Sequence, residues 1–293
     1  MRYSLSHLTQ YCYPQPVANS YNLVCLTPRQ LPYQQVLETG LEVNPLPSEL
    51  QQRTDYFGNT QHFIHLPGQH QQLAVTAKSI VSVQSQQNIL KIQDGITAGK
   101  LADYLASQCD PQALQAKLFV NASQLIPLLP ESEALIKPLM ARGQNVLQLA
   151  QALTQFIFAE FEYDTEFSTV VTPLSDVIRH KRGVCQDFAQ LAISCLRSVG
   201  VPTRYVSGYL ETQPPEGQPR LVGADASHAW FGVFDPDLGW IDFDPTNNLL
   251  ADEQHLTVAF GRDYADVVPL KGLLQGNGEH TLTVAVDVAP MPA

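Results

Sequence analysis

The feature that most constrains the fold of this chain is a cysteine at the start of an amphipathic helix. Apolar residues recur after Cys185 at spacings typical of one buried helix face, at Phe188, Leu191, Ala192, Cys195, Leu196 and Val199. Gly183 allows a tight turn just before the cysteine, and Gly200 and Pro202 mark the end of the pattern. We therefore predict a helix that begins at Cys185 and buries one face.

A cysteine at this position is suited to act as a nucleophile. The first N–H groups of a helix have no partner within it, and the positive end of the helix dipole stabilises anions. The thiolate is such an anion and is the reactive form of cysteine. Cysteine is also a common small hydrophobic residue, however, so Cys185 could simply be packed at a helix start. The helix by itself leaves both readings open.

Downstream, the sequence indicates a β-hairpin. Residues 225–234 read as a loop entering a strand, 235–239 as a turn, and 240–244 as the returning strand, which Pro245 ends. If Phe234 pairs with Trp240, His228 and Asp244 become diagonal neighbours on one face, with Cα atoms about 7–8 Å apart. A slip of one residue would separate them.

Together these residues favour catalysis. Cys185 would be the nucleophile, His228 would take its proton, and Asp244 would orient the imidazole and stabilise its charge. Taken singly, His228 could be a half-buried strand histidine and Asp244 a turn carboxylate. Asp242 is the competing acid, but in the same register it lies opposite Gly232, further along the hairpin, and ranks second.

Five sequence blocks, in this order, closely resemble the bacterial transglutaminase-like family, part of the broad papain-like class of cysteine enzymes. The blocks are GVCQDFA (183–189), GVPTRYVSGY (200–209), SHAW (227–230), GW (239–240) and DPTN (244–247). The resemblance implies that Cys185, His228 and Asp244 form the triad of the family. The chain departs from the family at Gln190, where a histidine is usual; this position lies outside the triad.

The resemblance extends beyond these blocks. Residues 261–272 look like a motif that follows the triad in bacterial members. The N-terminal segment is similar to the β-rich domain that precedes such cores, at Tyr13, Pro16-Val17, Leu26-Thr27-Pro28 and residues 55–59. The likeness is weak between roughly 86 and 140. It implies an α+β protein with a papain-like/transglutaminase-like core, in which the nucleophile helix lies against an antiparallel sheet.

We predict three parts along the chain. Residues 1–85 alternate apolar and polar in short runs, which favours a β-rich, β-sandwich-like domain. Residues 86–140 read as a connecting segment with short helices. Residues 141–293 read as the catalytic core, including a C-terminal strand that alternates cleanly and should join a sheet.

Composition excludes several classes of function. The net charge of −11 argues against nucleic acid or an anionic membrane as a partner. No apolar run is long enough to span a bilayer, and no secretory signal is visible at the N-terminus. The five cysteines show no pairing pattern, which suits reduced thiols and a cytoplasmic location. No Cys-x-x-Cys or His-Glu-x-x-His spacing occurs, so we predict no metal site.

The expected chemistry is acyl transfer at a peptide or carboxamide carbonyl through a thioester, without a cofactor. If water accepts the acyl group, the protein is a protease or amidase acting on a peptide or protein, which is the reading we favour. If an amine accepts it, the protein is a protein-glutamine transglutaminase. A non-catalytic binding module that retains the fold is the third reading. The sequence does not identify the acceptor, the substrate or the oligomeric state.

An oxyanion hole is also expected. The backbone N–H of Cys185 is its first candidate donor, because it lies at a helix start. Tyr163, from the 161–168 loop, is a candidate second donor, although its interpretation as an aromatic residue of the core ranks ahead of this one. Gln186 and Trp230 are further candidates for lining the site.

Overall fold

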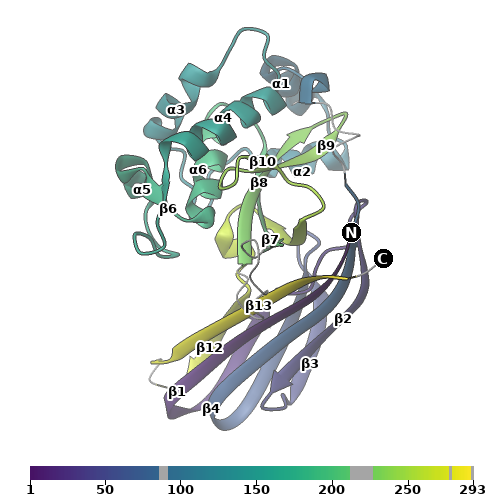
Figure 1. Cartoon of the computed structure of the whole chain (residues 1–293), viewed down its shortest axis with the longest axis vertical. Coiled ribbons are helices and arrows are strands. Elements are labelled where there is room, and N and C mark those ends of the chain that lie inside the picture. Colours follow the sequence, from purple (N-terminus) through teal and green to yellow (C-terminus); the bar gives the residue numbers. More distant parts are fainter. Residues whose placement is uncertain (86–91, 212–226, 277–278, 292–293) are drawn as a thin grey trace, which may run out of the picture.

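The computed structural model describes residues 1–85, 92–211, 227–276 and 279–291. A strand-rich first part is followed by helices packed with a smaller antiparallel sheet, so the predicted α+β class is confirmed (Figure 1). Figure 1 shows the helices gathered at one end of the molecule and the long strands at the other.

The larger sheet is antiparallel. It consists of β1 (Arg2–Val24), β2 (Gln34–Asn44), β3 (Glu49–Thr54), β4 (Thr60–Val83), β12 (Leu270–Gln275) and β13 (Thr281–Met291). β1 and β4 pair with each other along most of their length. β13 and β12 share the other edge of β1, and β2 and β3 share the other edge of β4. The strand-rich region is therefore one continuous sheet built on two long strands.

The two C-terminal strands join this sheet rather than the smaller one. β13 pairs with residues Arg2 to Cys12 of β1, and β12 pairs with Asn19 to Val24. The predicted division grouped them with the catalytic core in the range 141–293, because alternation identifies a strand but not its partner. The domain boundaries themselves stay a prediction.

The smaller sheet carries the hairpin predicted from the sequence. Its strands, in spatial order, are β10 (Leu249–Leu250), β9 (Gly239–Asp244), β8 (Ser227–Asp235), β7 (Thr203–Leu210) and β11 (His255–Gly261). A separate parallel pair is formed by β5 (Glu162–Tyr163) and β6 (Arg182–Gly183). Residues 225 and 226, at the start of the predicted hairpin, lie outside the described residues.

Six α-helices occur in the described part of the chain. They are α1 (Ala98–Ser107), α2 (Pro111–Leu118), α3 (Pro130–Ile136), α4 (Val146–Glu160), α5 (Leu174–His180) and α6 (Cys185–Ser198). Short helices thus occupy the predicted connecting segment, apart from residues 86–91, which lie outside the description. Asn145 caps α4 as its sequence indicates, since its side chain accepts the N–H of Gln148 at 2.8 Å.

No helix among the described residues has the length and apolar character needed to cross a membrane.

Helix α6 begins at Cys185 as predicted, but it is buried on more than one face. It packs on β7 and β8 and is surrounded by α3, α4 and α5, so Gln190, Ser194 and Arg197 are buried as well. The Arg197 guanidinium donates to the carbonyl oxygens of Thr203 and Arg262, each at 2.7 Å from Nη2. These polar residues fall between the apolar positions, so the apolar pattern alone indicated a single face.

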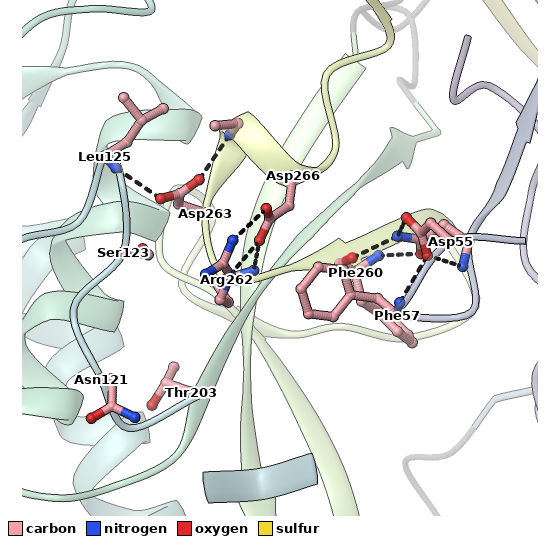
Figure 2. Close-up of polar contacts among 12 residues, drawn as sticks. Asp55, Phe57, Asn121, Ser123, Leu125, Thr203, Phe260, Arg262, Asp263 and Asp266 are labelled. Carbon is pink, nitrogen blue, oxygen red and sulfur yellow. Dashed lines mark hydrogen bonds and ion pairs between the residues drawn. The ribbon is translucent and has the colours of Figure 1, made fainter. Parts of the chain in front are cut away.

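The motif at 261–267, which begins at the end of β11, contacts the segment that precedes α3. Asp263 accepts the backbone N–H of Leu125 at 2.8 Å, and Asp266 forms an ion pair with Arg262 at 2.9 Å (Figure 2). The motif lies at a junction of elements, and its acidic residues are occupied in these structural contacts.

Two side-chain amides from the strand-rich region pair with the outer edge of β11. Gln34 donates to the carbonyl oxygen of Thr257 at 2.7 Å and accepts its N–H at 2.8 Å. Asn59 makes the same two contacts with Phe260, at 2.7 and 2.8 Å. Figure 2 shows the loop of Asp55 and Phe57 beside Phe260. The amides replace the next strand, so the edge of β11 is closed by side chains.

Replacing Gln34 with methionine tests this pairing. Gln34 is fully buried, and its loss would leave the N–H of Thr257 unpaired, while the carbonyl oxygen of Thr257 would still accept the backbone N–H of Arg29 at 3.0 Å. We expect the free energy of unfolding to fall by about 1–3 kcal/mol for the unpaired N–H group. Gln35→Met, at an exposed neighbouring position, should change it by less than about 0.5 kcal/mol. Equal midpoints for both variants in urea unfolding would contradict the role given to Gln34.

Candidate active site

Cys185 is held at the start of α6 by the residues around it. The carboxylate of Asp187 accepts the backbone N–H of Val184 at 2.9 Å and the hydroxyl of Ser168 at 2.5 Å. Gly183 is required here by close packing, because an added Cβ would lie 2.8 Å from the Cβ of Asp187. Cys185 is half-buried, and the N–H groups of this first helical turn point out of the helix end.

The hairpin register predicted from the sequence is confirmed. Phe234 pairs with Trp240 and Gly232 pairs with Asp242. His228 and Asp244 consequently meet on one face, with the imidazole Nε2 2.8 Å from the carboxylate Oδ2. The contact depends on residues close in sequence, which is why the turn sufficed to predict it.

The Asp244 carboxylate is completely buried and accepts hydrogen bonds at both oxygens. Oδ1 accepts the backbone N–H groups of Thr246 at 2.9 Å and Asn247 at 3.2 Å. Oδ2 contacts His228, the side-chain amide of Asn247 at 2.7 Å and His255 at 3.1 Å. Burial alone raises the pKa of Asp244, but the hydrogen bonds from His228 and His255 outweigh it and hold the pKa well below its usual range.

The His228 imidazole lies between this carboxylate and the thiol. Burial lowers its pKa, but hydrogen bonds to Asp244 and to Cys185 outweigh burial and raise the pKa to about 10. Since Nε2 is directed at Asp244, Nδ1 is the ring nitrogen left for Cys185. The structure thus brings together all three residues of the predicted triad.

Asp242, the competing acid, is engaged elsewhere. Its carboxylate forms a buried ion pair with Arg204 at 3.2 Å and accepts the indole N–H of Trp230 at 3.3 Å. The Arg204 guanidinium in turn lies over the ring of Phe260, 3.4 Å from its centroid. Asp242 therefore serves a structural ion pair beside the site.

The three predicted lining residues differ in burial. Trp230 is completely buried, and its ring contacts those of His255 and His228 at centroid distances of 5.1 and 5.9 Å. Tyr163 pairs with Gly183, and its half-exposed ring packs edge-on against Phe188 at 6.3 Å. Gln186 is half-buried in the first turn of α6. A role in the oxyanion hole stays a prediction for Tyr163 and Gln186.

Sequence analysis missed His255, and it assigned Asn247 no role although the residue lay in a quoted motif. Both donate to Asp244. Every residue of β11 is buried, so this strand shows no alternation that would direct attention to its first residue. The contact joins two strands that are not neighbours in the sheet, and no local pattern predicts it.

His228, Asp244 and His255 place three ligand atoms within 4.8 Å of one another, a spacing that could hold a metal ion. The proton positions argue against this use. His255 Nδ1 accepts the backbone N–H of Asp252 at 3.2 Å, so the neutral ring carries its proton on Nε2, directed at Asp244. A protonated ring nitrogen has no lone pair for a metal. The cluster fits a hydrogen-bond network around a carboxylate.

The pKa of His228 predicts how stability depends on pH. A folded-state pKa above the usual 6.5 means that the His228–Asp244 interaction stabilises the fold fully below pH about 6.5 and less as pH rises through the folded-state value. We expect the unfolding free energy of a Cys185→Ala protein, minus that of Cys185→Ala/His228→Gln, to shrink between pH 6 and pH 10. The alanine prevents the thiol from titrating in parallel. A difference that grows in urea titrations would contradict the direction of this shift.

Two family models match the chain. The bacterial transglutaminase-like N-terminal region matches residues 3–82, and the transglutaminase-like superfamily matches residues 133–245. An uncharacterized protein of Mycobacterium tuberculosis is 35% identical over 99% of this chain and 93% of its own length. A protein-glutamine gamma-glutamyltransferase of Pseudomonas aeruginosa is 31% identical over 49% of this chain and 23% of its own length.

Among solved structures, that of a candidate cysteine protease from Cytophaga hutchinsonii superposes with a TM-score of 0.76. The match covers 100% of this chain and 91% of the Cytophaga hutchinsonii chain, at 19% identity, and shows that the two proteins share a fold. Together with the sequence matches over nearly the whole length, this fold shows that the chain belongs to the transglutaminase-like superfamily.

Proposed function

We propose that this protein is a cysteine-dependent acyl-transfer enzyme that hydrolyses a peptide or carboxamide bond. One observation carries the proposal: the buried Asp244 carboxylate contacts His228 Nε2 at 2.8 Å, and the same imidazole hydrogen-bonds Cys185 at the helix start. This order of carboxylate, imidazole and thiol is what nucleophilic catalysis by cysteine requires. Similarity to a candidate cysteine protease supports the same chemistry.

In the first half of the proposed reaction, the Cys185 proton passes to His228 and the thiolate attacks the carbonyl carbon. The C=O π electrons move to oxygen, and the N–H groups at the start of α6 stabilise that oxyanion. When the oxyanion collapses, the carbon–nitrogen bond breaks and the leaving amine takes the proton from His228. The product is a thioester on Cys185.

In the second half, His228 takes a proton from water as the water oxygen attacks the thioester. The carbon–sulfur bond then breaks and releases the acid, and the Cys185 thiolate beside the His228 imidazolium is restored. Asp244 keeps the ring oriented and stabilises its positive charge in both halves. This sequence balances without a cofactor.

An amine acceptor is the second candidate, because the Pseudomonas aeruginosa relative is named a protein-glutamine gamma-glutamyltransferase. Attack by an amine on the same thioester would give an isopeptide or substituted amide. The same three residues serve both reactions, so the acceptor must be found by experiment. A binding module without catalysis needs none of the three residues, and we rank it last.

Intact-protein mass spectrometry tests the nucleophile and the acceptor together. Wild type and Cys185→Ala are mixed with a library of amides and esters, with and without a primary amine. We expect a wild-type acyl adduct that Cys185→Ala does not form, and free acid as the main product. Cys12 and Cys109 are exposed, so their alanine variants are the controls for incidental labelling. Amine-dependent products would favour the transferase, and no adduct with any substrate would favour the binding module.

Asp244→Asn and Asp242→Asn form a matched pair of variants. Asp244→Asn should lower kcat by about 10²–10⁴ because the imidazole is no longer correctly oriented. Asp242→Asn should leave kcat per folded molecule nearly unchanged but lower stability, because it breaks the buried pair with Arg204. Unfolding midpoints measured alongside kcat separate these effects. If Asp242→Asn abolished turnover in a folded protein, the acid assigned to the triad would be wrong.

A further inference from the structure

The carboxylate of Asp244 is shared by two histidines from different strands. His228, on β8, and His255, the first residue of β11, both direct Nε2 at the same oxygen, at 2.8 and 3.1 Å. His255 is only 4% exposed, and its ring packs edge-on against Trp230. The triad alone uses one of these two contacts, so the second requires an explanation.

The direction of the second hydrogen bond is fixed by the backbone. The N–H of Asp252 donates to His255 Nδ1 at 3.2 Å, and the N–H of His255 donates to the carbonyl oxygen of Asp252 at 2.8 Å. Nδ1 therefore carries no proton, and Nε2 of the neutral ring must be the donor to Asp244. His255 is held in this tautomer by main-chain atoms.

We propose that His255 is a positioning residue of the site, a second histidine whose Nε2–H occupies part of the Asp244 carboxylate and so limits how strongly Asp244 holds the His228 ring. The effect of His255 on catalysis rests on the proposed function. The donation from His255 to Asp244 rests on the hydrogen-bond geometry alone.

The effect is on the charge of the carboxylate more than on its orientation. Without His255, Asp244 would still accept from Thr246, from the backbone and side chain of Asn247, and from His228. These bonds keep the carboxyl group in place. With one donor fewer, Oδ2 carries more negative charge and holds the imidazolium proton more tightly. The proton would then be released less readily to a leaving amine.

The titratable groups around His255 are identifiable within the described residues. Asp244 and His228 face its Nε2, and Asp252 lies at the turn that holds Nδ1. Across a small cavity lie Tyr33 and Asp242, the latter neutralised by Arg204. Burial raises the pKa of Tyr33 well above its usual value, so the phenol stays neutral. Of these groups, the proposal concerns the charge of the His228 imidazole.

Three substitutions at His255 separate donation from packing. His255→Phe keeps an aromatic ring against Trp230 but cannot donate, His255→Leu also lacks a donor, and His255→Gln keeps an N–H near the position of Nε2. Each is made in the Cys185→Ala background, and the His228 ring is followed by histidine-labelled NMR between pH 5 and 11. His228→Gln identifies its signal. This readout needs no substrate.

We expect the titration midpoint of His228 to rise by about 0.5–1 pH unit in the Phe and Leu variants and to stay near the parent value in the Gln variant. In proteins that retain Cys185, kcat should fall by about threefold to tenfold for Phe and Leu, with rescue by Gln. If either donor-free variant folds, the comparison can be made.

An unchanged or lowered midpoint in the donor-free variants would overturn the proposal, as would equal midpoints for Gln and Phe. The proposed function fails separately, through the absence of any acyl adduct on Cys185. A protein without such an adduct would still report the His255–Asp244–His228 coupling by NMR. Failure of the enzyme reading and failure of the positioning reading are therefore distinguishable.

Discussion

The arrangement of the candidate active site depends on one buried negative charge. Asp244 is completely removed from solvent, and an unpaired carboxylate in such a place would be strongly unfavourable. Its oxygens instead accept from the turn that follows β9 and from histidines on β8 and β11. These strands meet at one end of the smaller sheet, where β8 begins, β9 ends and β11 begins. The stability of the charge thus requires the hairpin, the turn and the edge strand to be in place together.

The strand-rich region contributes to the site indirectly, through β11. That strand lies at the edge of the smaller sheet. An edge with unpaired N–H and C=O groups is unstable and tends to pair with the strands of other chains. Gln34 and Asn59 close the edge with side-chain amides, so the strand that begins with His255 is fixed by the first third of the chain. The C-terminal strands return to β1, which ties both ends of the chain to that support.

Sequence predicted the parts of the site that depend on local order. The helix beginning at Cys185 follows from apolar spacing, and the contact of His228 with Asp244 follows from a short turn that sets the register. His255 escaped prediction because it reaches Asp244 across two intervening strands. The apolar spacing predicted one buried face of α6 and did not indicate the burial of Gln190 and Arg197, because burial on several faces depends on α3, α4 and α5 rather than on the helix itself. The partner of β13 is likewise non-local, because more than 250 residues separate it from β1.

In the proposed reaction, His228 is the adjustable element of the site. Asp244 is saturated with donors and fixed by backbone N–H groups, so its position tolerates the loss of a single contact. Each donor nevertheless competes with His228 for the same negative charge, and a change in any of them alters how firmly the imidazolium proton is held. Cys185 responds to two influences, the fixed partial charge of the helix end and the imidazolium. The first is set by the backbone, and the second is set by how the Asp244 carboxylate is divided between two histidines.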